Sequence, residues 1–341
     1  MEPKTMDTNR ITQRSLLKPF RVISVIPGEA EGVSMIFAKR QAAYLRKEGI
    51  VGKLFFLASR TSPSILVKEW QRLRREIKTF KPNLIHANYG SITACFCILP
   101  TRLPLVVTYR GSDLNPTPSA PWLRSAVVRF LSQIAALRAK RIICVSDQLK
   151  RSLWWRRSRA TVIPSGVDLT IFYPRPWDEA RSELGWGKKE RVILFNAGCH
   201  EKVKRLDLAQ SAVNVARNYC GEIRFVVLNG YVEPKRIPIL MNASDCLLFT
   251  SDWEGSPNVV KEALACNLPI VSVDVGDIRV RIAGVRPSKI VARDTNEIGK
   301  ALAEVLMRGE RSNGFETIQK LSLDRITTQI LAVYLKALRE Q

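Results

Sequence analysis

Short apolar runs alternate with longer stretches of helical periodicity along most of the chain. After the first twenty residues, strand-like runs fall at 21–27, 52–57, 83–87, 105–109, 141–145 and 160–163. Between them, apolar positions recur every three or four residues at 33–48, 64–79, 90–99, 121–138 and 147–155. Because strands that alternate with helices build a parallel sheet covered by helices, the pattern predicts an α/β unit.

The alternation restarts in the second half of the chain. Strands are predicted at 191–197, 223–229, 246–250 and 269–273, and helices at 204–217, 258–266, 294–308 and 322–339. A segment rich in proline and glycine, 164–176, separates the two series. Two doubly wound, Rossmann-like domains facing each other would bind a ligand in the cleft at the carboxyl ends of their strands.

We therefore expect four parts. These are a polar tail (1–20), an N-terminal Rossmann-like domain (21–165), a C-terminal Rossmann-like domain (166–320) and a C-terminal helix (321–341). It is left open whether the last helix crosses back to the first domain.

Composition excludes several classes of protein. Of the 341 residues, 46% are hydrophobic and 25% are charged, as in soluble globular proteins. The longest uncharged stretch, 82–101, contains too many polar residues for a membrane span, and the first twenty residues lack the apolar core of a signal peptide. The seven cysteines form no C-x-x-C pair, which indicates reduced thiols and a cytoplasmic protein. With two histidines, a histidine-based metal site is not expected, nor is a cofactor.

The positive charge is concentrated in the first half of the chain. The whole chain has 54 Lys and Arg against 31 Asp and Glu, a net charge of +23. Residues 1–165 carry 29 basic and 9 acidic side chains, whereas the remainder carries 25 and 22. Nucleic acid, an anionic membrane leaflet or a phosphorylated acceptor would each neutralise this excess. Nucleic acid is disfavoured because no RNA-recognition, zinc-finger or basic-zipper pattern is present.

Two segments of the basic half suit an anionic membrane surface. Residues 122–138 place apolar side chains at helical spacing among arginines, and residues 150–159 set two tryptophans among basic residues. Amphipathic basic helices and interfacial tryptophans are typical of peripheral membrane contact. An apolar helical stripe is also what a surface helix presents to its own core. Both interpretations stay open at this point.

Candidate chemistry lies after the predicted strand at 246–250. A loop there contains Glu254, and a helix starts near Asn258 and carries Glu262 about one turn later. The open N-terminus of a helix suits a phosphate, and a carboxylate one turn on suits a ribose diol. A carboxylate in the preceding loop suits the hydroxyls of a sugar. For two acids alone, the preferred explanation is a Glu254 that supports the loop and a Glu262 that faces solvent on an amphipathic helix.

The segment E-G-S-P-N-V-V-K-E-A resembles the E-x7-E element of retaining GT-B glycosyltransferases, in particular family 4. Other segments resemble that family in the same order. They are Gly32 before the first helix, N-L-I-H-A-N at 83–88, G-S-D at 111–113, V-I-P-S-G-V-D at 162–168, and Asn196-Ala197-Gly198 followed by Lys204-Arg205. The resemblance covers about residues 21–285. It implies that the N-terminal domain (21–165) binds the acceptor and the C-terminal domain (166–320) the nucleotide sugar.

The resemblance implies a GT-B fold and the metal-independent transfer of a sugar, with retention, from a nucleotide sugar to an acceptor hydroxyl. Lys204 and Arg205 would neutralise the donor diphosphate, Glu262 would hold the ribose and Glu254 the transferred sugar. The expected catalytic residues are Glu254, Lys204 and Arg110. The expected substrate-binding residues are Gly32, Arg205, Gly255, Ser256, Asn258, Val259 and Glu262.

Two positions depart from the family pattern. Arg110 stands where the family often has histidine, and Cys199 and His200 follow the glycine where it often has arginine. We hypothesise that Arg110 contacts a donor phosphate or an anionic acceptor; the alternative is a surface charge at a strand end. Arg205 is a candidate to replace the missing arginine. His86 is expected to be a satisfied strand residue and not a catalyst.

The expected partners follow from the resemblance and the charge. The donor is a UDP- or GDP-sugar, and the acceptor is a lipid-linked or anionic glycan, as in cell-surface polysaccharide synthesis. The protein is expected in the cytoplasm, and peripheral attachment to the cytoplasmic face of the membrane is an open alternative. The alternatives are another GT-B enzyme, such as an epimerase or phosphorylase, or a non-catalytic basic protein that binds membranes or nucleic acid.

Overall fold

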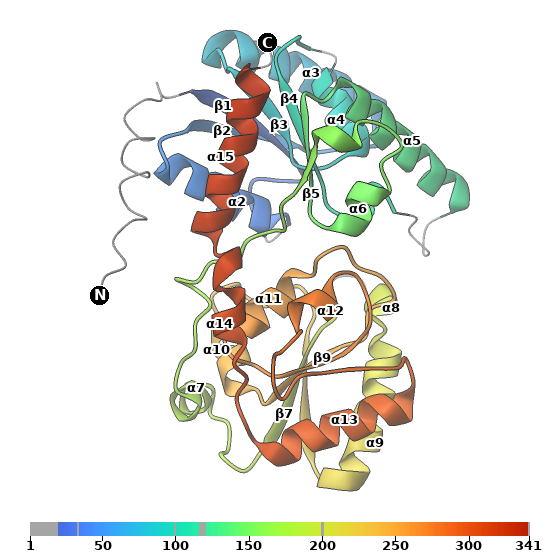
Figure 1. Cartoon of the computed structure of the whole chain (residues 1–341), viewed down its shortest axis with the longest axis vertical. Coiled ribbons are helices and arrows are strands. Elements are labelled where there is room, and N and C mark those ends of the chain that lie inside the picture. Colours follow the sequence, from blue (N-terminus) through green and yellow to red (C-terminus); the bar gives the residue numbers. More distant parts are fainter. Residues whose placement is uncertain (1–19, 33, 99, 116–120, 199–200, 340–341) are drawn as a thin grey trace.

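The computed structural model describes residues 20–339 except 33, 99, 116–120 and 199–200. Two parallel sheets, each with its own helices, lie one above the other along the long axis of the molecule (Figure 1). All paired strands within both sheets run parallel. The predicted α/β class with two doubly wound sheets is therefore confirmed.

The first sheet has six strands in the order β2-β1-β3-β4-β5-β6. Its strands are β1 (Arg21–Pro27), β2 (Val51–Leu57), β3 (Leu84–Ala87), β4 (Leu105–Tyr109), β5 (Arg141–Cys144) and β6 (Ala160–Val162). The helices that connect them are α2 (Ile36–Lys47), α3 (Pro63–Phe80), α4 (Ser91–Ile98), α5 (Trp122–Arg138) and α6 (Asp147–Arg151), followed by the short 3₁₀ helix η1 (Arg157–Arg159). Every residue of β3 and β4 is buried, because helices cover both faces of the sheet.

The second sheet has five strands in the order β11-β10-β9-β7-β8. Its strands are β7 (Arg191–Asn196), β8 (Ile223–Leu228), β9 (Cys246–Phe249), β10 (Ile270–Val273) and β11 (Lys289–Val291). Its helices are α7 (Trp177–Leu184), α8 (Glu201–Lys204), α9 (Leu206–Cys220), α10 (Ile237–Ala243), α11 (Asn258–Ala265), α12 (Ile278–Arg281), α13 (Thr295–Arg308) and α14 (Gly314–Ile318). The 3₁₀ turn η2 (Gln319–Leu321) and the last helix α15 (Leu323–Arg339) follow.

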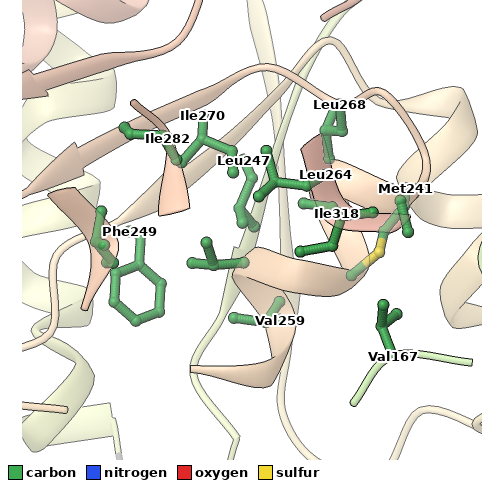
Figure 2. Close-up of a cluster of buried hydrophobic side chains, with 14 of the residues drawn as sticks. Val167, Met241, Leu247, Phe249, Val259, Leu264, Leu268, Ile270, Ile282 and Ile318 are labelled. Atoms are coloured by element: carbon green, nitrogen blue, oxygen red, sulfur yellow. The ribbon is translucent and has the colours of Figure 1, made fainter. Parts of the chain in front are cut away.

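The core of the second unit fixes the position of α11. Val259 and Leu264 of this helix lie in one buried cluster with Leu247 and Phe249 of β9 and Ile270 of β10 (Figure 2). A helix locked on its apolar face holds its polar side chains in one orientation. The same core therefore determines where Glu262, which follows Val259 by three residues on α11, lies.

The last helix packs on the first sheet, although it follows the second unit in the sequence (Figure 1). The Tyr334 hydroxyl lies 2.7 Å from Nδ1 of His86, and its ring meets that of Phe20 edge-on with centroids 6.2 Å apart. The chain passes between the two units twice, near Val167 and again near Leu321. Val167 joins these two segments, because it forms backbone hydrogen bonds of 2.9 Å with Leu321 and with Leu323.

Some element boundaries differ from the predicted ones. The helix expected over 204–217 is divided, because Arg205 has a left-handed φ of 58° that separates α8 from α9. The helix expected over 147–155 ends at Arg151, and the backbone N–H of Trp154 binds the side chain of Gln133 instead. The short elements β11, α7 and α10 carry too few periodic positions to have been predicted.

Helix α5 does not turn its large apolar side chains to the core. Ser132, Gln133, Ala135 and Ala136 are its buried residues. Its exposed apolar side chains are Trp122, Leu123, Val127, Phe130, Ile134 and Leu137. The interpretation of this stripe as a core face is therefore wrong. No helix in the described part of the chain is long and apolar enough to cross a membrane.

Candidate functional site

The loop after β9 and the start of α11 form one wall of the site. Pro257 occupies the N-cap position of α11, and within the described part of the chain no side chain caps the first N–H groups of the helix. The side-chain oxygen Oδ1 of Asn258 is buried and has no hydrogen-bond partner among the described residues. The amides of Asn258 and Val259 thus remain available to an anion at the positive end of the helix dipole.

Lys204 and Glu254 form an ion pair at this wall. Each side chain is about one-fifth exposed (22% and 18%). The hydroxyl of Thr250 donates a 2.8 Å hydrogen bond to the carbonyl oxygen of Lys204, and the N–H of Asp252 donates one of 2.9 Å to that of Val203. These bonds hold α8 against the loop after β9. The structure therefore brings the expected phosphate ligand to the expected sugar ligand.

Arg205 points to other partners. Its guanidinium pairs with Asp207 at 2.9 Å and with Asp252 at 3.3 Å. The hydrogen bond with Asp207 raises the pKa of Arg205 above its usual range. Because Arg205 is held by two carboxylates, its role as a ligand of the diphosphate stays a prediction.

Glu262 faces a cavity of about 180 Å³ between the two units. The residues that line this cavity are Ile36, Arg40, Phe172, Asn196, Leu228, Gly230, Val232, Pro234, Ile237, Val259 and Glu262. Nη1 of Arg40, from the first unit, lies 3.7 Å from Oε1 of Glu262. Burial raises the pKa of Glu262, and the charge of Arg40 opposes that shift. Glu262 is therefore a cleft residue and not a solvent-facing one.

Arg110 belongs to the first unit, where it directly follows the carboxyl end of β4. It donates hydrogen bonds to Oδ1 of Asn88 and Oγ of Ser165, both 3.1 Å, and its guanidinium stacks 4.4 Å from the ring centre of Phe37. Burial lowers the pKa of Arg110 to about 10. The alternative of a surface charge at a strand end is therefore wrong.

Asp113 fixes the loop that carries Arg110. Its carboxylate accepts hydrogen bonds from the backbone N–H groups of Gly90 (3.0 Å), Arg110 (3.0 Å) and Gly111 (2.8 Å). The loops after β3 and β4 are thereby joined by one buried side chain. The predicted G-S-D segment thus has a structural purpose that the spacing alone did not indicate.

Gly255 forms the contact between the two walls. A Cβ atom at this position would lie 2.8 Å from the carbonyl oxygen of Arg110, closer than real Cβ contacts allow. The neighbouring hydroxyl of Ser256 donates a 2.8 Å hydrogen bond to Asp277. Gly255 therefore permits close approach of the units, while the Ser256 hydroxyl is already used within the protein; their expected substrate contacts stay predictions.

Gly32 lies in the loop that enters the first helix. Its φ of 79° is left-handed, and, its chain neighbours apart, no atom of the described residues lies within 4 Å of the position where a Cβ would stand. Nζ of Lys39 holds this loop through the carbonyl oxygens of Ala30 (2.9 Å) and Gly32 (3.1 Å). The structure gives Gly32 an open position suited to a ligand, and its binding role stays a prediction.

Of the two histidines, the structure describes His86. Nε2 of His86 pairs with the hydroxyl of Thr108 at 2.7 Å, and Nδ1 pairs with Tyr334. Burial, with a smaller effect of the Arg110 charge, lowers the pKa of His86 to about 3. His86 is a satisfied buried residue, as predicted. Cys199 and His200 lie outside the described residues.

Sequence reasoning missed two charged residues of the cleft. Arg40 has no motif around it, and only its place in the first helix after Gly32 could have drawn attention to it. Lys261 lies within the E-x7-E segment, and its Nζ donates a 2.9 Å hydrogen bond to the carbonyl oxygen of Ser165. Both were missed because their partners lie in the other half of the chain.

The arrangement combines cations, open amides and carboxylates at the carboxyl ends of strands in both sheets. Lys204 and the start of α11 suit an anionic leaving group, and Glu254 and Glu262 suit hydroxyl groups. In the described part of the chain, no cluster of three or more His, Cys, Asp and Glu could hold a metal ion. The arrangement can thus stabilise a negative charge that develops during group transfer.

Two family models match the chain. "Glycosyltransferase Family 4" matches residues 31–171, and "Glycosyl transferases group 1" matches residues 190–308. Together they cover more than half of the sequence. TuaC of Bacillus subtilis (strain 168), a candidate glycosyltransferase of teichuronic acid biosynthesis, is 24% identical over 238 residues. That match covers 62% of this chain and 60% of the relative.

Solved structures show the same arrangement of two units. Sucrose-phosphate synthase from Thermosynechococcus elongatus has a TM-score of 0.77 at 16% identity, covering 94% of this chain and 100% of that chain. HepE of Anabaena, solved in complex with UDP and glucose, has a TM-score of 0.70 at 15% identity, covering 93% and 99%. At such identities the likeness shows the fold, which is the predicted GT-B arrangement.

Proposed function

Because this chain belongs to the family 4 glycosyltransferases and has their GT-B fold, we propose that it transfers a sugar from a nucleotide-sugar donor to an acceptor hydroxyl. The observation that carries the proposal is the meeting of Lys204, Glu254 and Glu262 with the uncapped start of α11. These groups match, in order, the diphosphate, the transferred sugar and the ribose of one donor.

The donor is proposed to lie along α11. Glu262 accepts hydrogen bonds from the ribose diol after exchanging its contact with Arg40, and the amides of Asn258 and Val259 bind the diphosphate. The cavity beyond Glu262, lined by Val232 and Pro234, accommodates the base. We propose a UDP-sugar as donor, with a GDP-sugar as the alternative; the presence of UDP in the HepE structure supports the first.

Lys204 is proposed to act on the leaving group. Its ammonium group is paired with Glu254 and would turn to the diphosphate, which gains negative charge as the glycosidic bond breaks. Glu254 is then free to accept hydrogen bonds from the sugar hydroxyls. Transfer is proposed to proceed without a metal ion and with retention, the mode typical of the E-x7-E enzymes that the sequence resembles.

The acceptor is proposed to be a lipid-linked or anionic glycan in cell-surface polysaccharide synthesis. The net charge of the first 165 residues and the likeness to TuaC support this choice. We propose that Arg110, whose guanidinium donates hydrogen bonds to Asn88 and Ser165, also contacts an anionic group of the acceptor. The first unit is proposed to act at the anionic cytoplasmic face of a membrane.

The donor site is tested by thermal unfolding with UDP, GDP, ADP and their sugars, all with EDTA present. One nucleotide should raise the Tm of the wild type, and Glu262→Ala should lose that rise because the ribose loses its acceptor. Glu179→Ala, a change at an exposed residue of α7, is the matched control and should keep the rise. No rise with any nucleotide, in a folded protein, would favour a non-catalytic basic protein.

The products separate transfer from other GT-B reactions. Incubation of the enzyme with the nucleotide sugar alone should leave the sugar unchanged apart from slow hydrolysis. An epimerised sugar in that incubation would contradict transfer, and absorbance of bound pyridoxal phosphate would indicate a phosphorylase. The anomeric configuration of a transferred sugar tests retention directly.

A further inference from the structure

Helix α5 and the segment that follows α6 share one exposed surface. It consists of Trp122, Leu123, Val127, Phe130, Ile134, Leu137, Trp154 and Trp155, and we call it the α5–tryptophan surface. Gln133 of α5 joins the two parts through hydrogen bonds with Ser152 and Trp154, and the guanidinium of Arg129 lies 5.4 Å from the ring centre of Trp154. The two parts are thus held together as one surface.

The exposure of this surface is unusual. Among the described residues, sixteen large apolar side chains are exposed, and these eight belong to them. Trp122 is 80% exposed and Leu123 is 59% exposed. Single exposed apolar residues are normal in soluble proteins, but a contiguous group marks an interaction site. Since α5 buries only small or polar side chains, its large apolar ones are available to a partner.

Charge decides which partner fits. Residues 121–160 contain ten Lys and Arg and a single acidic residue, Asp147. A second copy of the chain would bring the same basic surface against itself, and like charges would oppose that contact. A nucleic acid would neutralise the charge but offers little to aliphatic side chains such as Leu123 and Val127. An anionic bilayer accommodates both kinds of side chain. The apolar side chains insert below the headgroups, and the arginines pair with the lipid phosphates.

We propose that the α5–tryptophan surface docks on an anionic phospholipid bilayer. The inference rests on the proposed function, in which the first unit acts at an anionic membrane face, and it adds which surface of that unit lies on the membrane. Tryptophans at both parts of the surface suit the headgroup level, where an apolar ring and a polar N–H are both satisfied. Helix α6, between the two parts in sequence, lies on the side of the first unit that faces the second (Figure 1). Docking would therefore bring the cleft close to the bilayer.

The test is co-sedimentation of the full chain with vesicles of phosphatidylcholine plus phosphatidylglycerol, and of phosphatidylcholine alone. The variant L123S/V127S/F130S removes three exposed apolar side chains from the surface. Those three are 59%, 50% and 52% exposed, and the control V67S/V280S/M307S removes three apolar side chains elsewhere that are 57%, 71% and 57% exposed. The wild type and the control should bind the anionic vesicles, less at high salt. The surface variant should bind them at least about tenfold more weakly, because burial of apolar groups drives insertion.

Three outcomes would overturn the inference. They are a wild type that stays in the supernatant with anionic vesicles at low salt, equal losses in both variants, and a wild-type dimer in gel filtration that only the surface variant loses. The nucleotide-induced rise in Tm, measured on the same three proteins, separates the two proposals. A rise without vesicle binding defeats the docking surface alone, whereas vesicle binding without any rise defeats the proposed donor site.

Discussion

The ammonium group of Lys261 donates a 2.9 Å hydrogen bond to the carbonyl oxygen of Ser165, which lies 96 residues earlier in the chain. Lys261 directly precedes Glu262 on α11, and Ser165 lies in the segment that joins the two sheets and also binds Arg110. One buried lysine thus connects the donor side of the cleft to the segment between the units and, through Ser165, to Arg110. The relative position of Glu262 and Arg110 depends on this contact.

The buried Lys261 should make stability depend on pH. Burial lowers its pKa to about 7, whereas an unfolded lysine titrates near 10.4. Between about pH 7 and pH 10 the unfolded chain binds one proton more, so the contribution of Lys261 to stability rises with pH. The free energy of unfolding of the wild type minus that of Lys261→Met should therefore increase over this window, by up to about 1.4 kcal/mol per pH unit. Urea unfolding at several pH values measures the difference.

Lys300→Met, at an exposed residue of α13, provides the control for that series. Its difference from the wild type should not change with pH between 7 and 10. A flat difference for Lys261→Met as well would show that the buried amine does not titrate in this range.

His86 should make the protein sensitive to acid. Its pKa of about 3 in the folded state lies below the usual 6.5, so the unfolded chain binds one proton more between these values. The stability that His86 contributes is present above about pH 6.5 and declines as the pH falls toward 3. His86→Gln should reduce the pH dependence of the free energy of unfolding between pH 4 and pH 6.5. An unchanged pH dependence in that variant would contradict the burial of a neutral imidazole.

Tyr334→Phe tests the contact that attaches α15 to the first sheet. It removes the hydroxyl that pairs with Nδ1 of His86 and leaves a buried polar atom without a partner. We expect a loss of about 1–3 kcal/mol in the free energy of unfolding. Tyr173→Phe, at a half-exposed tyrosine, should change stability by much less. Equal effects of the two changes would mean that the buried hydrogen bond contributes nothing.

Lys204→Met should impair turnover far more than nucleotide binding. The ammonium group is proposed to act mainly on charge that develops in the transition state, and loss of such a group lowers kcat by roughly 10²–10³-fold. Lys202→Met removes a neighbouring exposed lysine of α8 and should leave kcat near that of the wild type. Initial rates of nucleotide release measure both. A fall confined to the donor KM would assign Lys204 to ground-state binding instead.

Arg110→Ala should lower activity if Arg110 contacts an anionic substrate group as proposed, because the cleft then loses a buried cation. We expect a fall in kcat/KM of at least about tenfold, the loss of one charge-assisted hydrogen bond. Arg102→Ala, at an exposed arginine in the turn before β4, is the control. Full activity in Arg110→Ala would refute a functional role of Arg110. If that variant also had a lowered Tm, the role of Arg110 would be structural.

Much of the fold was predictable because local patterns and the parallel-sheet rules agree. β1 and β4 occupy the predicted ranges, and the other predicted strands differ by a residue at an end. Errors arose where one residue overrides a pattern, as the left-handed Arg205 does in the helix expected over 204–217. The stripe on α5 could not be assigned from periodicity, because periodicity shows that a helix has an apolar face but not what covers it.

By itself, the sequence determined the two α/β units, the excess of positive charge in the first half, and the spacing of Glu254 and Glu262, since each depends on residues close together in the chain. Only the tertiary structure decided the contacts of Lys204 with Glu254, Arg40 with Glu262, and Lys261 with Ser165. It also decided that α15 packs on the first sheet and that α5 exposes its apolar face. These features depend on contacts between distant segments, which local periodicity and spacing do not encode.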